Sequence, residues 1–157
     1  MPRVRKILAA DGFLRFVEGR NPLCPGDGAR YRRAEVIVYH AIDVGEQWAN
    51  RRTQVSLHRN ILEESRRLLD RFLAENFADC IDLVEVRQVV EFGRPHKNIV
   101  EEAATEGVDI IVISTHGRTG IDHVIVGSVA EKVVAHAPCP VLVVPRHERQ
   151  ATTARAA

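Results

Sequence analysis

A glycine-containing segment in the last third of the chain has the residue types of an anion site. Residues 114–120 read Ser-Thr-His-Gly-Arg-Thr-Gly, and residues 127–129 read Gly-Ser-Val at the start of an apolar, helix-like stretch. Glycine lets the backbone turn tightly and approach a ligand closely, and free N–H groups at a helix N-terminus bind anions. His116 and Arg118 would add positive charge. The pattern predicts an anion site, with a loop that only needs turns and a helix that only needs a cap as the alternative.

Residues 128–131 read Ser-Val-Ala-Glu, which matches a capping box at the start of a helix. In such a box the serine hydroxyl accepts a hydrogen bond from one exposed backbone N–H, and the glutamate carboxylate accepts one from another. We therefore expect a capped helix over residues 128–137, with its remaining N–H groups and its dipole directed at the anion.

Asp11 is the second candidate, because Asp11-Gly12 follows the apolar residues 4–10 directly. In an open α/β sheet, ligands bind outside the carboxyl ends of strands, at the point where the strand order reverses. If the first and fourth strands are neighbours there, Asp11 faces the glycine loop and can bind a ribose hydroxyl or a phosphate-bound metal. The alternative is a plain turn, for which Asp-Gly is a common dipeptide.

Strand-like and helix-like segments alternate along the chain, which predicts an α/β fold with an open parallel sheet and helices on its faces. The strand-like segments are residues 4–10, 35–41, 83–92, 109–114 and 141–144. The helix-like segments are residues 53–77, residues 95–106 and residues 128–137. The second of these should begin at Pro95 and be ended by Gly107. Polar and apolar residues alternate in 83–92, which predicts a strand at the edge of the sheet, whereas 109–114 is apolar on both faces and should be central.

Residues 13–33 do not fit this alternation. They would have to supply the crossover helix between the first two strands, because parallel neighbours cannot be joined by a tight turn. The segment contains three glycines and two prolines, namely Gly19, Gly26, Gly28, Pro22 and Pro25. A continuous helix there would cost about 9 kcal/mol relative to alanine. We therefore expect the first crossover helix to be disrupted, with at most one turn near residues 13–18.

The composition narrows the class of protein. The 157 residues suffice for one domain, expected over residues 1–146, with a flexible C-terminal tail over residues 147–157. The 22 basic and 21 acidic residues nearly cancel, which argues against nucleic-acid binding, and no apolar run is long enough for a membrane span. Cys24, Cys80 and Cys139 show no zinc or disulfide spacing, so a cytoplasmic protein is expected.

The chain resembles the universal stress protein family. Residues 108–144 carry most of the likeness, through Asp-Ile-Ile-Val-Ile-Ser-Thr-His-Gly-Arg-Thr-Gly, then Val-Gly-Ser-Val-Ala-Glu-Lys-Val-Val and Ala-Pro-Cys-Pro-Val-Leu-Val-Val. The opening Lys-Ile-Leu-Ala-Ala-Asp-Gly of residues 6–12 matches more loosely. The resemblance implies a five-stranded parallel sheet of order 3-2-1-4-5 and a homodimer that pairs its last strands, here residues 141–144.

The ATP-binding branch of that family has a motif of glycine, two residues, glycine, nine residues, then glycine followed by Ser or Thr. Gly117, Gly127 and Ser128 match this motif, whereas Ser114 stands where the first glycine belongs. The resemblance implies ATP with Mg²⁺ as the ligand, and a backbone contact between Ala41 and the adenine. With the two charged loop residues included, the expected nucleotide contacts are Asp11, Ala41, Ser114, His116, Gly117, Arg118, Gly120, Gly127, Ser128 and Val129.

Three functional hypotheses remain open. In the first, ATP binding switches a dimeric stress-response regulator, since the sequence places no general base or activated nucleophile beside the expected phosphates. In the second, the protein is a slow ATPase or phosphotransferase in which Asp11 holds a metal and His116 or Arg118 stabilises charge. In the third, which Ser114 and the broken crossover favour, it is a structural dimer that binds no nucleotide. The sequence holds no HExxH, GxSxG or GxxxxGK[ST] motif.

Overall fold

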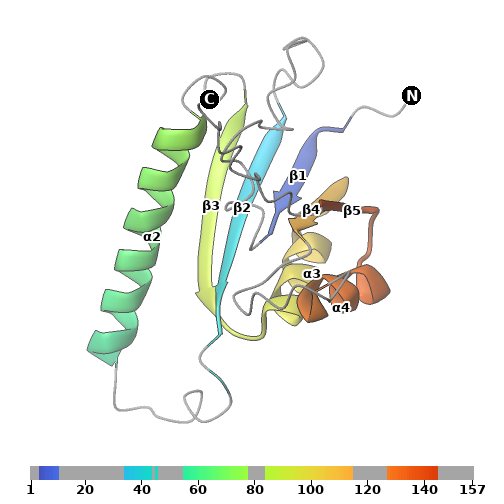
Figure 1. Cartoon of the computed structure of the whole chain (residues 1–157). Helices are drawn as coiled ribbons and strands as arrows, with labels where there is room; N and C mark the ends of the chain where they lie inside the picture. The colour runs from blue at the N-terminus through green and yellow to red at the C-terminus, as the bar shows by residue number, and fades with distance from the viewer. Residues whose placement is uncertain are drawn as a thin grey trace, which may run out of the picture.

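A five-stranded parallel sheet forms the centre of the molecule (Figure 1). The computed structural model describes residues 4–10, 34–43, 45, 55–77, 84–114 and 127–144. The strands are β1 (Lys6–Ala9), β2 (Glu35–Ile42), β3 (Glu85–Phe92), β4 (Ile110–Ser114) and β5 (Val141–Val144). They lie in the order β3-β2-β1-β4-β5, so the predicted fold class and strand order are confirmed.

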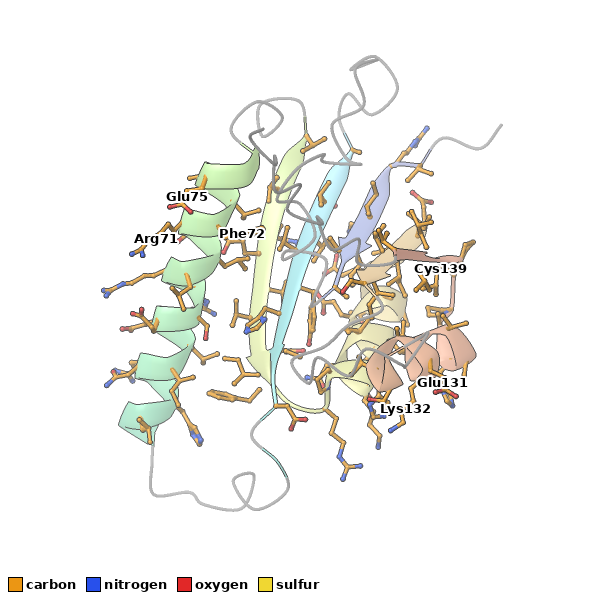
Figure 2. The ribbon with its side chains drawn as sticks, viewed as in Figure 1. Arg71, Phe72, Glu75, Glu131, Lys132 and Cys139 are labelled. Atoms are coloured by element: carbon orange, nitrogen blue, oxygen red, sulfur yellow. The ribbon has the colours of Figure 1, made fainter. Side chains whose placement is uncertain are left out.

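Helices cover both faces of this sheet, as predicted. α2 (Val55–Phe77) lies against one face, while α3 (Pro95–Glu106) and α4 (Ser128–His136) lie against the other (Figure 1). On α2, Phe72 points toward the sheet and Arg71 points away from it (Figure 2). Within the described parts of the chain, no helix is long and apolar enough to cross a lipid bilayer.

The sheet separates two apolar cores, because successive side chains of a strand point to opposite faces. Ile7 of β1 packs in one core with Leu69 of α2. Leu8, the next residue of β1, is fully buried in the other core with Ile99 of α3 and Val133 of α4. Each face of the central strand β1 is thus filled by helices that come from different parts of the sequence.

The predictions for β3 and α3 are confirmed in detail. β3 is an edge strand that pairs with β2 alone among the described strands, and its Glu85 is exposed while its Val90 is buried. α3 begins at Pro95, which has no N–H to leave unsatisfied. It ends at Gly107, whose left-handed backbone (φ 60°, ψ 46°) lets its N–H donate to the carbonyl of Ala103.

Two segments with specific predictions lie outside the described residues. The first is the crossover of residues 13–33, so its expected disruption stays a prediction. The second is the tail of residues 147–157, and with it the expected domain boundary at residue 146.

Opposite charges are paired at the amino ends of the strands. The Nζ of Lys6 lies 3.1 Å from a Glu35 carboxylate oxygen and 2.7 Å from one of Glu106. The guanidinium of Arg87 meets the same two carboxylates at 3.2 and 2.8 Å. These contacts tie β1, β2, β3 and α3 together at the edge of the sheet opposite to the carboxyl ends of the strands.

Candidate functional site

β1 is shorter than both of its neighbours at the carboxyl edge of the sheet. Its pairing with β2 ends at Ala9 and Val38, and its pairing with β4 ends at Ala9 and Val112. β2 continues to Ile42 and β4 continues to Ser114. The strand order reverses between β1 and β4, so this is the edge at which an open α/β sheet binds its ligands.

The backbone of Ala41 is directed toward the end of β1. In a parallel ladder the N–H and C=O of one residue point to the same neighbouring strand, and the side alternates along the chain. The N–H of Glu35 donates to Arg5 on the β1 side, whereas the carbonyl of Ile42 accepts from Gly93 on the β3 side. Ala41 lies an even number of residues after Glu35 on β2, so its N–H and C=O point to the β1 side as well. It therefore offers a donor and an acceptor there, beyond the last residue that β1 pairs with β2.

Ser114 ends β4 at the same edge. It pairs with Val144 of β5 and is 6% exposed, which makes it the one buried polar residue among those that the structure describes. Its side chain is thus shielded from solvent at the end of β4, at the position where the family motif has a glycine. A small side chain at this position is compatible with an undistorted β4–β5 ladder.

α4 starts one residue earlier than the capping-box pattern requires, so that prediction is wrong. The N-cap is Gly127, with extended backbone angles (φ −65°, ψ 148°), and the first helical hydrogen bond runs from the N–H of Glu131 to the carbonyl of Gly127. Ser128 is then the first helical residue, and no side-chain hydrogen bond caps the helix. A capping box needs the serine itself at the N-cap. Because Gly127 takes that place, no side chain caps the helix, and the N–H groups of Ser128 and Val129 lie uncapped at the positive end of the helix dipole.

The two halves of the expected site converge on one core. Ala41 of β2, Ile113 of β4 and Ala130 in the first turn of α4 belong to the same buried cluster. Ala41 and Ser114 lie at the carboxyl ends of β2 and β4, and Gly127, Ser128 and Val129 form the start of α4, whose other end leads into the amino end of β5. The other five candidates lie outside the described residues, and their roles stay predictions: Asp11, His116, Gly117, Arg118 and Gly120.

Sequence reasoning missed a hydrogen-bonded group beside Ala41. Tyr39 is fully buried, and its hydroxyl donates to the carboxylate of Glu91, which is the register partner of Ala41 on β3. The side-chain amide of Asn98 donates to the same carboxylate oxygen at 3.1 Å and to the carbonyl of Phe92 at 3.3 Å. Burial, and then the hydrogen bond to Glu91, raise the pKa of Tyr39. The tyrosine itself was the available signal, since a buried hydroxyl needs a partner.

The described residues offer little other chemistry. No three His, Cys, Asp or Glu side chains within them gather closely enough to hold a metal ion. Cys139 is half-buried and packs against the core that α3 and α4 cover. Burial raises the pKa of its thiol, which keeps the sulfur protonated and suits the expected packing role.

Comparison with known proteins points in one direction. Residues 27–145 match the universal stress protein family. The universal stress protein MJ0577 of Methanocaldococcus jannaschii is 33% identical over 127 residues, which cover 71% of this chain and 77% of that protein. The universal stress protein MJ0531 of the same organism is 45% identical over 58 residues, 37% of this chain and 34% of that protein.

Solved structures agree on the fold. The structure of protein MJ0577 matches with a TM-score of 0.70 at 29% identity, over 94% of this chain and 99% of that one. A universal stress protein in complex with cAMP matches at 0.53 and 21% identity, over 93% and 100% of the two chains. One from Arabidopsis thaliana with AMP bound matches at 0.54 and 17% identity, over 95% and 97%. At these two lower identities the likeness shows the fold alone.

Proposed function

The chain belongs to the universal stress protein family, and we propose that it is a dimeric regulatory protein whose switch is the binding of ATP with Mg²⁺. The observation that carries the proposal is the backbone donor and acceptor of Ala41, at the same end of the sheet as the uncapped start of α4. Relatives of the same fold were solved with cAMP and with AMP bound, which supports an adenine nucleotide as the ligand.

The base end of the ligand fits Ala41. Adenine has a ring nitrogen that accepts a hydrogen bond beside an exocyclic amine that donates one. A backbone N–H and C=O on the same side of one residue complement that pair. Guanine has the opposite arrangement, a donating ring nitrogen beside a carbonyl, so the same backbone would leave it unsatisfied.

The phosphate end fits the start of α4. The N–H groups of Ser128 and Val129 lie at the positive end of the helix dipole, where a phosphate is stabilised. We propose that the loop completes the contact through Gly117 and Gly120, with His116 and Arg118 adding charge. Asp11 would bind the ribose or the Mg²⁺ that accompanies the phosphates.

Thermal unfolding in the presence of nucleotides tests this function. At about 100 times its dissociation constant, Mg-ATP should stabilise the folded chain by roughly 2.7 kcal/mol, which raises the melting temperature by several degrees. Mg-GTP at the same concentration should raise it less, because of the base preference of Ala41. Equal curves with and without millimolar ATP, AMP or cAMP would show that the chain binds no adenine nucleotide.

We further propose that two chains pair through β5, the edge strand that follows the loop and α4. Leu142 of β5 is 48% exposed, and Val134 of α4 is 52% exposed. An exposed edge strand with apolar side chains is a template for pairing with another chain. Leu142→Arg should therefore convert a dimer into a monomer in sedimentation velocity, while Leu68→Arg on α2, at a leucine that is 53% exposed, should leave the dimer intact. A Leu142→Arg variant that still sediments as a dimer would assign the interface to another surface.

A further inference from the structure

Basic side chains gather where the first turn of α3 meets α4. α3 contributes Arg94 at its N-cap and His96 and Lys97 in its first turn, and α4 contributes Lys132 and His136. We call these five residues the α3–α4 basic surface. Arg94, Lys97, Lys132 and His136 are exposed, and Lys132 projects from the outer side of α4 (Figure 2).

His96, in the first turn of α3, is influenced by charges on both helices. Burial lowers the pKa of this imidazole, and the positive charges of Lys132, Lys97, Arg94 and His136 lower it further. All four of these residues are basic, and they come from both α3 and α4. His96 is therefore neutral at pH 7, and the lasting charge of the surface comes from Arg94, Lys97 and Lys132.

The fold itself does not require this concentration of charge. At the other end of the sheet, Lys6 meets two carboxylates and Arg87 meets three. Lys97 and Lys132, in contrast, form no ion pair with any described carboxylate. The first turn of α3 also holds no acidic residue, although a helix N-terminus favours negative charge. Basic residues there oppose the helix dipole, so they weaken α3 unless an anion offsets them.

We propose that the α3–α4 basic surface is a docking surface for an acidic segment of a partner protein. The exposed charges of Lys97 and Lys132 suit a short run of aspartate and glutamate. Glu101, one turn beyond Lys97, and Glu131, next to Lys132, bound the surface on its two helices and would repel a long polyanion.

A nucleic acid suits this surface less well. Single-stranded nucleic acids bind proteins through aromatic stacking as well as charge. The described aromatic residues lie on β2, α2 and β3, namely Tyr39, Phe72, Phe77 and Phe92. None of them lies on α3 or α4.

The surface is compatible with the proposed dimer and does not depend on the proposed ATP site. Side chains of a helix advance by about 100° per residue, so Lys132 and Val134 lie on different sides of α4. A second copy paired along β5 would leave the α3–α4 basic surface open. Lys132 lies one turn after Ser128, so a docked partner would sit beside the expected phosphates and could sense whether they are there.

Fluorescence anisotropy with a dye-labelled oligoglutamate peptide tests the proposal on the full chain at low salt. The double variant Lys97→Glu, Lys132→Glu should bind the peptide at least about tenfold more weakly, a loss of about 1.4 kcal/mol. Lys97→Glu places an acid in the first turn of α3, which favours the helix. The melting temperature of the variant should therefore not fall, and unfolding cannot explain the lost binding.

A matched control makes the same charge change elsewhere. Arg66 and Arg71 are exposed on α2, and Arg66→Glu with Arg71→Glu should leave peptide binding within about twofold of the parent. Equal losses in the two double variants would overturn the proposal, as would a parent chain that does not bind the peptide. An oligothymidylate of equal charge that binds more tightly than the peptide would assign the surface to nucleic acid instead.

Discussion

Replacing Gly127 by aspartate should abolish nucleotide binding and at the same time stabilise the fold. Gly127 is the N-cap of α4, and its backbone angles (φ −65°, ψ 148°) are open to any residue. Aspartate is a better N-cap than glycine by a few tenths of a kcal/mol, and its charge suits the helix dipole. The conformation of the chain thus gives no reason for glycine here, whereas the close approach of the proposed phosphates would give one.

The same carboxylate would lie where the proposed phosphates bind. Like charges at that distance should lower the affinity for ATP by at least about 100-fold, which corresponds to 2.7 kcal/mol. Isothermal titration with Mg-ATP and urea unfolding of the same preparation measure the two effects. A Gly127→Asp variant that binds ATP like the parent would mean that the phosphates do not lie at the start of α4.

The N-cap of α3 provides the control. Arg94 is the N-cap of that helix and its side chain makes no capping hydrogen bond, and Arg94→Asp should improve α3 in the same way. It should leave the affinity for ATP within about threefold, because α3 starts at the end of β3 rather than at the switch between β1 and β4. Equal losses of ATP binding in the two variants would indicate a general effect of added negative charge instead of a contact at Gly127.

How far the sequence predicted this molecule depended on the range of the interactions involved. Local patterns succeeded: the alternation in residues 83–92 predicted the edge strand β3, and Pro95 and Gly107 predicted both ends of α3. The capping-box prediction failed although the residues were right, because a single preceding residue, Gly127, takes extended angles and becomes the N-cap itself.

For the long-range contacts at the candidate site, the sequence could signal that a partner is needed but not which residue supplies it. Tyr39 and Glu91 are 52 residues apart, and their hydrogen bond depends on a register between β2 and β3 that no short motif encodes. The direction of the Ala41 backbone likewise follows from where the β1–β2 ladder ends. The family resemblance pointed to Ala41 as a contact of the adenine. Only the end of the β1–β2 ladder gives a physical reason for that role.

Gly93→Ala should cost about 2–4 kcal/mol of unfolding free energy, more than an alanine at any other described glycine. Gly93 has a φ of 154°, a conformation that residues with a side chain rarely adopt. A Cβ there would overlap the Nδ2 of Asn98 and lie 2.5 Å from its Oδ1. Asn98 would have to move, and it would then lose its hydrogen bonds to Glu91 and Phe92. Urea unfolding measures the loss.

Two comparisons separate the strain from the displaced hydrogen bonds. Gly107 also has a positive φ, 60°, but a Cβ there would have nothing within 4 Å, so Gly107→Ala should cost only the conformational term of about 1–2 kcal/mol. In an Asn98→Ala background the Cβ at Gly93 no longer meets the amide, so Gly93→Ala should cost less there than in the parent. Equal costs in both backgrounds would mean that Asn98 does not explain the glycine. Gly93→Ala can also be compared with Asn98→Ala for ATP binding. If Gly93→Ala costs less in the Asn98→Ala background, and both single variants bind ATP more weakly than the parent, the hydrogen bonds of Asn98 support Ala41 through Glu91, its neighbour on β3.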